Sequence, residues 1–146
     1  MTGKVVRTLL LVLAVSAAVV GLWAQFAPLS FYRSFPLHGH AWVGADGPYN
    51  EHLIRDVGGL NLALALLSVT AAVRLSRSLV RVAAGAWVAY GVPHVIYHAL
   101  HIKLHGAFDL AGELGLLIGG VVMAVVVLAL SGRVVSSGPE APAVPG

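Results

Sequence analysis

The stretch that decides the fold covers residues 9–27, which read LLLVLAVSAAVVGLWAQFA. A helix needs about 20 consecutive apolar residues to cross a bilayer, and a short basic segment with Lys4 and Arg7 precedes this run. A signal peptide has an apolar core of only about 7–15 residues, followed by a small-residue cleavage site, and no good site of that kind follows here. We therefore expect a retained first membrane helix over residues 5–27, with a cleaved signal peptide as the alternative.

The composition of the whole chain agrees with that reading. Hydrophobic residues make up 58% of the 146 residues and charged residues 10%, whereas a soluble domain carries about 25% charged residues. The formal net charge is +3, but the Lys and Arg residues are scattered at segment ends and form no basic stripe with interleaved aromatics, which argues against nucleic-acid binding. There is no cysteine, which excludes disulfides and thiolate metal sites. The composition predicts an integral membrane protein.

Three further apolar segments follow, over about residues 50–73, 79–105 and 108–130. Asn50 is a suitable N-cap for the first of them, and Glu51 places negative charge in its first turn. Residues 131–146 have the composition of a disordered tail. The sequence thus predicts an all-α protein, a four-transmembrane-helix bundle that forms one domain over residues 1–130.

Residues 28–50 interrupt the apolar pattern. Pro28, Pro36 and Pro48 argue against a long helix, and five aromatic residues suit the membrane–water interface. These aromatic residues are Phe31, Tyr32, Phe35, Trp42 and Tyr49. We expect a long, ordered interfacial loop between the first and second helices, with a short helical turn at 29–34.

The distribution of basic residues predicts the orientation. Four spans place both termini on one side of the membrane, and six basic residues on that side compare with three on the other. The six are Lys4, Arg7, Arg74, Arg77, Arg81 and Arg133; the three are Arg33, Arg55 and Lys103. Cytoplasmic loops carry the excess of Lys and Arg. We expect a multi-pass protein of the cytoplasmic membrane with cytoplasmic N- and C-termini.

All seven histidines then lie toward the extracytoplasmic face. Four of them, His94, His98, His101 and His105, have a 4-3-4 spacing that stacks them along one helix face. The i, i+4 pairs His52/Asp56 and Asp109/Glu113 lie at the same predicted depth on two other helices. Four-helix bundles build metal and cofactor sites from side chains on facing helices. The candidate metal ligands are His52, Asp56, His94, His98, His101 and Glu113.

Two hypotheses follow for this set of residues. Mixed histidine and carboxylate ligands suit Zn, Fe or Cu(II), and histidines from facing helices would also suit haem, so the leading hypothesis is a small metal- or haem-binding membrane protein. If it is an enzyme, we expect a membrane metal- or haem-dependent oxidoreductase, although no paired His-His box is present. The alternative is a non-catalytic accessory or interaction subunit of a membrane complex, with a structural or pH-sensitive polar cluster. The expected partners are the lipid bilayer and either further copies of the chain or a larger membrane complex.

Residues 55–67, RDVGGLNLALALL, resemble the second helix of small DoxX-like four-helix membrane proteins. In that group a charged residue at the membrane edge precedes a Gly-Gly pair and a Leu/Ala-rich run. The resemblance extends in size and span number over most of residues 5–130. It implies an architecture and no activity, because members of the group are mostly uncharacterised.

Overall fold

The computed structural model describes residues 1–103 and 106–133. Within these residues the chain is helical, and four helices are long and apolar enough to cross a membrane. The all-α, four-helix prediction is therefore confirmed. The elements are α1 (Thr2–Phe26), α2 (Pro28–Ser34), α3 (Trp42–Asp46), α4 (Glu51–Arg74), α5 (Arg77–Leu100), α6 (Ala107–Leu130) and the short 3-10 turn η1 (Ser131–Arg133).

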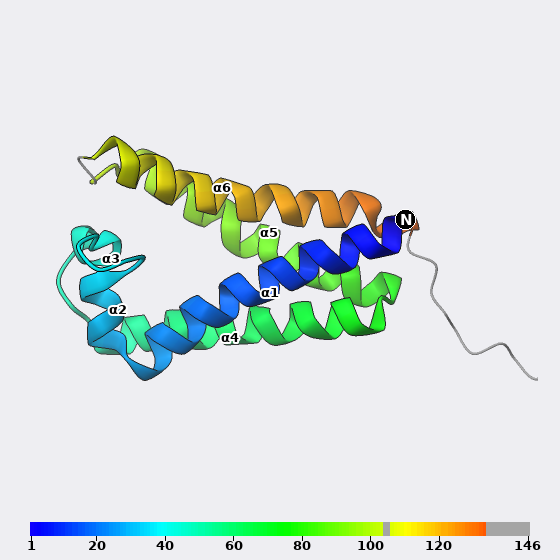
Figure 1. The fold of residues 1–146 in the computed structure, drawn as a ribbon, viewed down its shortest axis with the longest axis horizontal. Helices are drawn as coiled ribbons and strands as arrows, with labels where there is room; N and C mark the ends of the chain where they lie inside the picture. The colour runs from blue at the N-terminus through cyan, green and yellow to red at the C-terminus, as the bar shows by residue number, and fades with distance from the viewer. Residues whose placement is uncertain (104–105, 134–146) are drawn as a thin grey trace, which may run out of the picture.

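The four long helices form two pairs, α1 with α4 and α5 with α6 (Figure 1). At one end of the bundle, here called the terminal end, lie Met1, η1 and the short connection between α4 and α5. At the opposite end, here called the loop end, the two pairs diverge, and α2 and α3 lie there (Figure 1). The bundle is thus closed by its long helices at one end and by the α1–α4 connection at the other.

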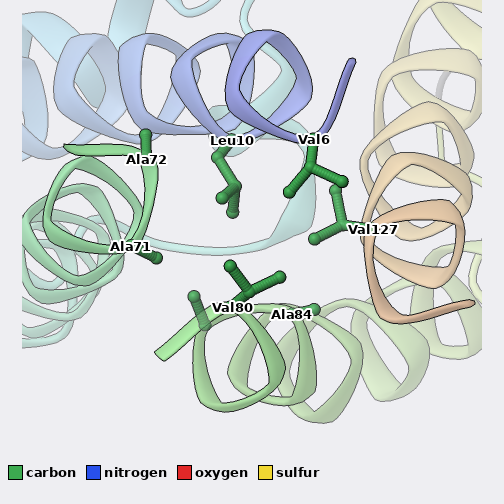
Figure 2. Close-up of a cluster of buried hydrophobic side chains, with 8 residues drawn as sticks. Val6, Leu10, Ala71, Ala72, Val80, Ala84 and Val127 are labelled. Carbon is green, nitrogen blue, oxygen red and sulfur yellow. The ribbon is translucent and has the colours of Figure 1, made fainter. Parts of the chain in front are cut away.

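The terminal end is closed by apolar side chains from all four long helices. Figure 2 shows Val6 and Leu10 of α1 pointing toward Val80 of α5, with Val127 of α6 beside them. All four of these side chains are fully buried. Small residues of α4, such as Ala71, complete the cluster. Packing of these side chains holds the ends of the four helices together at the terminal end.

The close pairing of α1 and α4 depends on two glycines. A Cβ on Gly21 would lie 2.9 Å from the backbone nitrogen of Leu62, and a Cβ on Gly58 would lie 2.7 Å from that of Gln25. Real Cβ atoms do not approach backbone nitrogens this closely, so only glycine allows this helix spacing. Small residues at such positions are typical of membrane helix interfaces.

Local capping explains where α4 and α5 begin. The Asn50 side chain accepts a hydrogen bond from the backbone nitrogen of Leu53 at 3.1 Å, as the sequence predicts, and the Ser76 hydroxyl accepts one from Leu79 at 3.3 Å. Each cap satisfies one of the free N–H groups in the first helical turn.

The end of the third long helix and the content of the predicted loop differ from the prediction. The third long helix ends at Leu100 rather than at 105, because His101 leaves helical geometry and its ring nitrogen bonds the carbonyl oxygen of Tyr97 at 2.9 Å. His105 lies outside the described residues, as do residues 134–146 of the predicted tail. The predicted interfacial loop contains two short helices: α2 coincides with the expected turn at 29–34, and α3 was not expected.

Candidate functional site

A cluster of ionisable side chains from α3, α5 and α6 lies at the loop end, around His98. Its Nδ1 atom lies 3.0 Å from Oε1 of Glu113, and its Nε2 atom lies 3.1 Å from Nε2 of His94 and 3.9 Å from Oδ2 of Asp46. We call these four residues the His98 cluster. One imidazole therefore connects a carboxylate on α6, a carboxylate on α3 and a second imidazole on its own helix.

The helical repeat of α5 places the two histidines together. His94 and His98 are four residues apart, so their rings share one face of the helix, with centroids 4.9 Å apart. The side chains of His98 and Glu113 are only 10% and 12% exposed. Polar groups buried to this degree are stable only when they are hydrogen-bonded, and among the described residues no buried side-chain nitrogen or oxygen lacks a partner.

The hydrogen bonds of the cluster are compatible with either charge state of His98. A neutral His98 donates from Nδ1 to Glu113 and accepts at Nε2 from His94. A protonated His98 donates from both nitrogens, to Glu113 and to His94. The charges differ, however, because only the imidazolium places a positive charge between Glu113 and Asp46.

A second contact holds the α1–α4 connection on α6. Oδ1 of Asp109 accepts a hydrogen bond from Nε1 of Trp42 at 2.9 Å and lies 2.6 Å from Nδ1 of His40. The Trp42 ring covers Gly112, where a Cβ would come within 3.0 Å of it. Lys103 adds a third contact by donating from Nζ to the backbone oxygen of Asp46 at 2.7 Å. The segment from His40 to Asp46 is thus attached to α6 and to the end of α5 by polar contacts.

Polar residues continue along α5 into the bundle. The ring of Tyr90 meets that of His94 edge-on, with centroids 5.2 Å apart, and one turn earlier Nε1 of Trp87 donates to the buried hydroxyl of Ser68 at 2.9 Å. Asn61 is buried on α4, where its amide donates to the carbonyl oxygen of Val57 at 2.9 Å. Polar side chains inside a membrane are costly unless they are paired. Trp87, Ser68 and Asn61 each have a hydrogen-bond partner inside the bundle.

The structure divides the six predicted metal ligands. His94, His98 and Glu113 lie in the His98 cluster. His52 and Asp56 pair with each other at 3.0 Å on an exposed face of α4, with side chains 87% and 63% exposed. His101 stacks on Tyr97 at the exposed end of α5. The cluster is therefore formed by α5, α6 and α3, and the His52/Asp56 pair of α4 lies outside it.

Two participants were not among the predicted ligands. Asp46 reaches His98 from α3, and His40 reaches Asp109 from the preceding loop. The signal available in the sequence was their position on the same side of the membrane as the other acids and histidines. Over residues 1–103 and 106–133, no group of three or more histidine, aspartate or glutamate side chains is arranged to hold a metal ion.

No protein-family model, curated protein sequence or solved structure matches this chain.

Proposed function

We propose that the protein is a non-catalytic, four-span membrane protein whose His98 cluster holds the α1–α4 connection against α5 and α6 in a proton-dependent way. The observation that carries this proposal is the position of His98, which is buried and lies between Glu113 of α6 and Asp46 of α3. A protonated His98 places a positive charge between the two carboxylates and a neutral His98 does not, so the docking of this surface segment depends on the protonation of His98.

The distribution of charged residues supports an extracytoplasmic position for the His98 cluster. The terminal end carries six of the nine basic residues, and every acidic residue in the described part of the chain lies toward the loop end. By the positive-inside rule, the termini are cytoplasmic and the His98 cluster faces the outside of the cytoplasmic membrane. The cluster is then exposed to external rather than cytoplasmic pH.

A role within a larger assembly fits the surface of α6. This helix is the least buried of the four long ones, and a Cβ on Gly115 or Gly119 would meet nothing within 4 Å. Small residues four apart on a membrane helix allow a partner helix to approach closely. We therefore propose that α6 contacts another membrane helix, from a second copy or from a different subunit.

Metal or haem binding is the second candidate, and its basis is the donor chemistry of the cluster. Histidine and carboxylate ligands suit Zn, Fe or Cu(II). The proton-dependent proposal is favoured because His98 and Glu113 already bond each other and the described residues contain no metal-holding group.

Thermal unfolding of the detergent-purified protein separates the two candidates. We expect unfolding temperatures that are unchanged by EDTA or by added Zn²⁺, and that are higher at about pH 6 than at about pH 8.5 by a margin that shrinks in His98→Gln. A metal site would instead give stabilisation that grows with free metal concentration. A pH dependence identical in wild type and His98→Gln would contradict the proposed role of His98.

A further inference from the structure

The lipid-facing side of the α1–α4 pair carries a groove in the half of the bundle near the terminal end. Two hollows make up this groove, and they meet at Leu11. The hollow nearer the terminal end is bounded by Arg7, and the other extends along α1 as far as Ala18. At a rise of 1.5 Å per residue, Arg7 and Ala18 are about 16 Å apart along the axis, which is close to half the hydrocarbon thickness of a bilayer.

The shape of the groove follows from residue size. Small side chains, such as Ala14 and Ala65, are buried where the two helices touch, while branched side chains, such as Leu66 and Val69, stand exposed at its edge. An open apolar groove that runs along two membrane helices can hold an extended lipid acyl chain.

Arg7 gives the groove a polar end. Its Nε donates to the carbonyl oxygen of Ala72 at 3.1 Å, one of the last four carbonyls of α4, which have no partner within the helix. The guanidinium has five N–H donors. Among the described residues, the bond from Nε to Ala72 is the one side-chain hydrogen bond that Arg7 donates. Arg7 is exposed, so a phosphate can reach the guanidinium and accept hydrogen bonds from two of its N–H groups.

Charge complementarity favours an anionic lipid over a second copy of the chain as the molecule that fills the groove. The described part of the terminal end contains Lys4, Arg7, Arg74 and further arginines, and no aspartate or glutamate. A second copy packed into the groove would place the arginine of one chain against an apolar or basic surface of the other, without a carboxylate to pair with it. An anionic lipid supplies both the acyl chain and the negative charge.

We propose that this groove binds one anionic phospholipid, with an acyl chain along α1 and α4 and the phosphate on Arg7. Native mass spectrometry of the full chain tests the proposal, with phosphatidylglycerol or phosphatidylcholine added at equal concentrations. We expect one retained phosphatidylglycerol, bound about fivefold more strongly than phosphatidylcholine. Arg7→Gln removes this preference, whereas Arg7→Lys keeps most of it and shows that the site still folds.

Matched variants separate the groove from general charge and apolarity. Lys4→Gln removes a basic residue at the same end that does not line the groove, and we expect the lipid preference to remain. Leu66→Ala removes an edge of the groove and lowers retention of both lipids about threefold, while Leu116→Ala on α6, at a similarly exposed position (65% against 71%), has no effect.

Three results would overturn the proposal. The first is equal retention of the two lipids by the wild type. The second is a loss of preference in Lys4→Gln as large as that in Arg7→Gln, which would indicate diffuse attraction. The third is a lipid-free dimer that Leu66→Ala dissociates, which would place a second copy in the groove.

Discussion

His98 is the residue on which the account of the loop end depends. It is the most buried histidine of the described part of the chain, and two carboxylates and a second imidazole surround it. Removing one member of a buried charged pair costs more than the pair contributes, because the remaining partner stays buried without compensation. Substitution of His98 should therefore cause a measurable loss of stability.

His98→Ala is expected to lower the free energy of unfolding by about 3 kcal/mol, because it leaves the Glu113 carboxylate buried without its imidazole. Unfolding of the detergent-solubilised protein, followed by circular dichroism, measures the change. His52→Ala provides the matched control, since His52 also pairs with a carboxylate but is 87% exposed; we expect a change below about 0.5 kcal/mol.

A double variant checks the assignment of the partner. In the His98→Ala background, Glu113→Gln should recover stability, because a neutral amide is cheaper to bury than a carboxylate. A loss that simply adds to that of His98→Ala would show that Glu113 does not depend on His98.

Sequence spacing identified part of this cluster and missed the rest for a physical reason. The i, i+4 relation correctly placed His94 beside His98, since helical geometry alone decides that contact. The i, i+4 spacing of His52 and Asp56 likewise predicts that the two share one face of the helix. It does not predict whether that face packs inside the bundle or lies on its surface. The contact of Asp46 with His98 could not be predicted, because the two residues are 52 positions apart in the chain. Asp46 also lies in a helix of five residues, which is too short to show a helical pattern in the sequence.

Among the elements, α1 and α4 show most clearly how small residues set helix spacing. Gly58 and Gly59 are adjacent in the sequence, but only Gly58 faces α1: a Cβ on Gly59 would meet its nearest neighbour, Oε1 of Gln25, at 3.9 Å. The four spans themselves were predictable because apolar run length is a local property. Which glycine of a pair faces the partner helix depends on the rotation of the helix, which the sequence pattern does not determine.

Gly58→Ala is expected to lower the free energy of unfolding by about 1–3 kcal/mol, because the new methyl group would force α1 and α4 apart. Gly59→Ala should leave stability unchanged or raise it, since alanine has the higher helix propensity. Unfolding of the two variants under the same detergent conditions gives the comparison. Equal losses in both would mean that helix spacing at Gly58 is looser than the structure shows.

Considered as a whole, the molecule separates two kinds of chemistry along the membrane normal. Basic residues gather at the terminal end, and histidines and carboxylates at the loop end. The apolar cluster in Figure 2 closes the first end, while polar contacts through Asp109 and His98 close the second. The orientation across the membrane decides which compartment each end meets.

The absence of cysteine makes this orientation simple to test. Single cysteines introduced at exposed positions, His38→Cys near the loop end and Ser78→Cys near the terminal end, can be labelled in intact cells with a membrane-impermeant maleimide. We expect labelling of the first and protection of the second until the cells are permeabilised. The reverse pattern would place the His98 cluster on the cytoplasmic side.

The most direct test of the central claim is the distance between α3 and α6 as a function of pH. Gly47 and Leu116 are suited to paired spin labels after substitution by cysteine, because a Cβ on Gly47 meets nothing within 4 Å and Leu116 is exposed. We predict one narrow distance distribution at about pH 6, a broader one at about pH 8.5, and a broad distribution at both values in His98→Gln. Distributions that do not change with pH or with the loss of His98 would contradict a proton-dependent closure of the loop end.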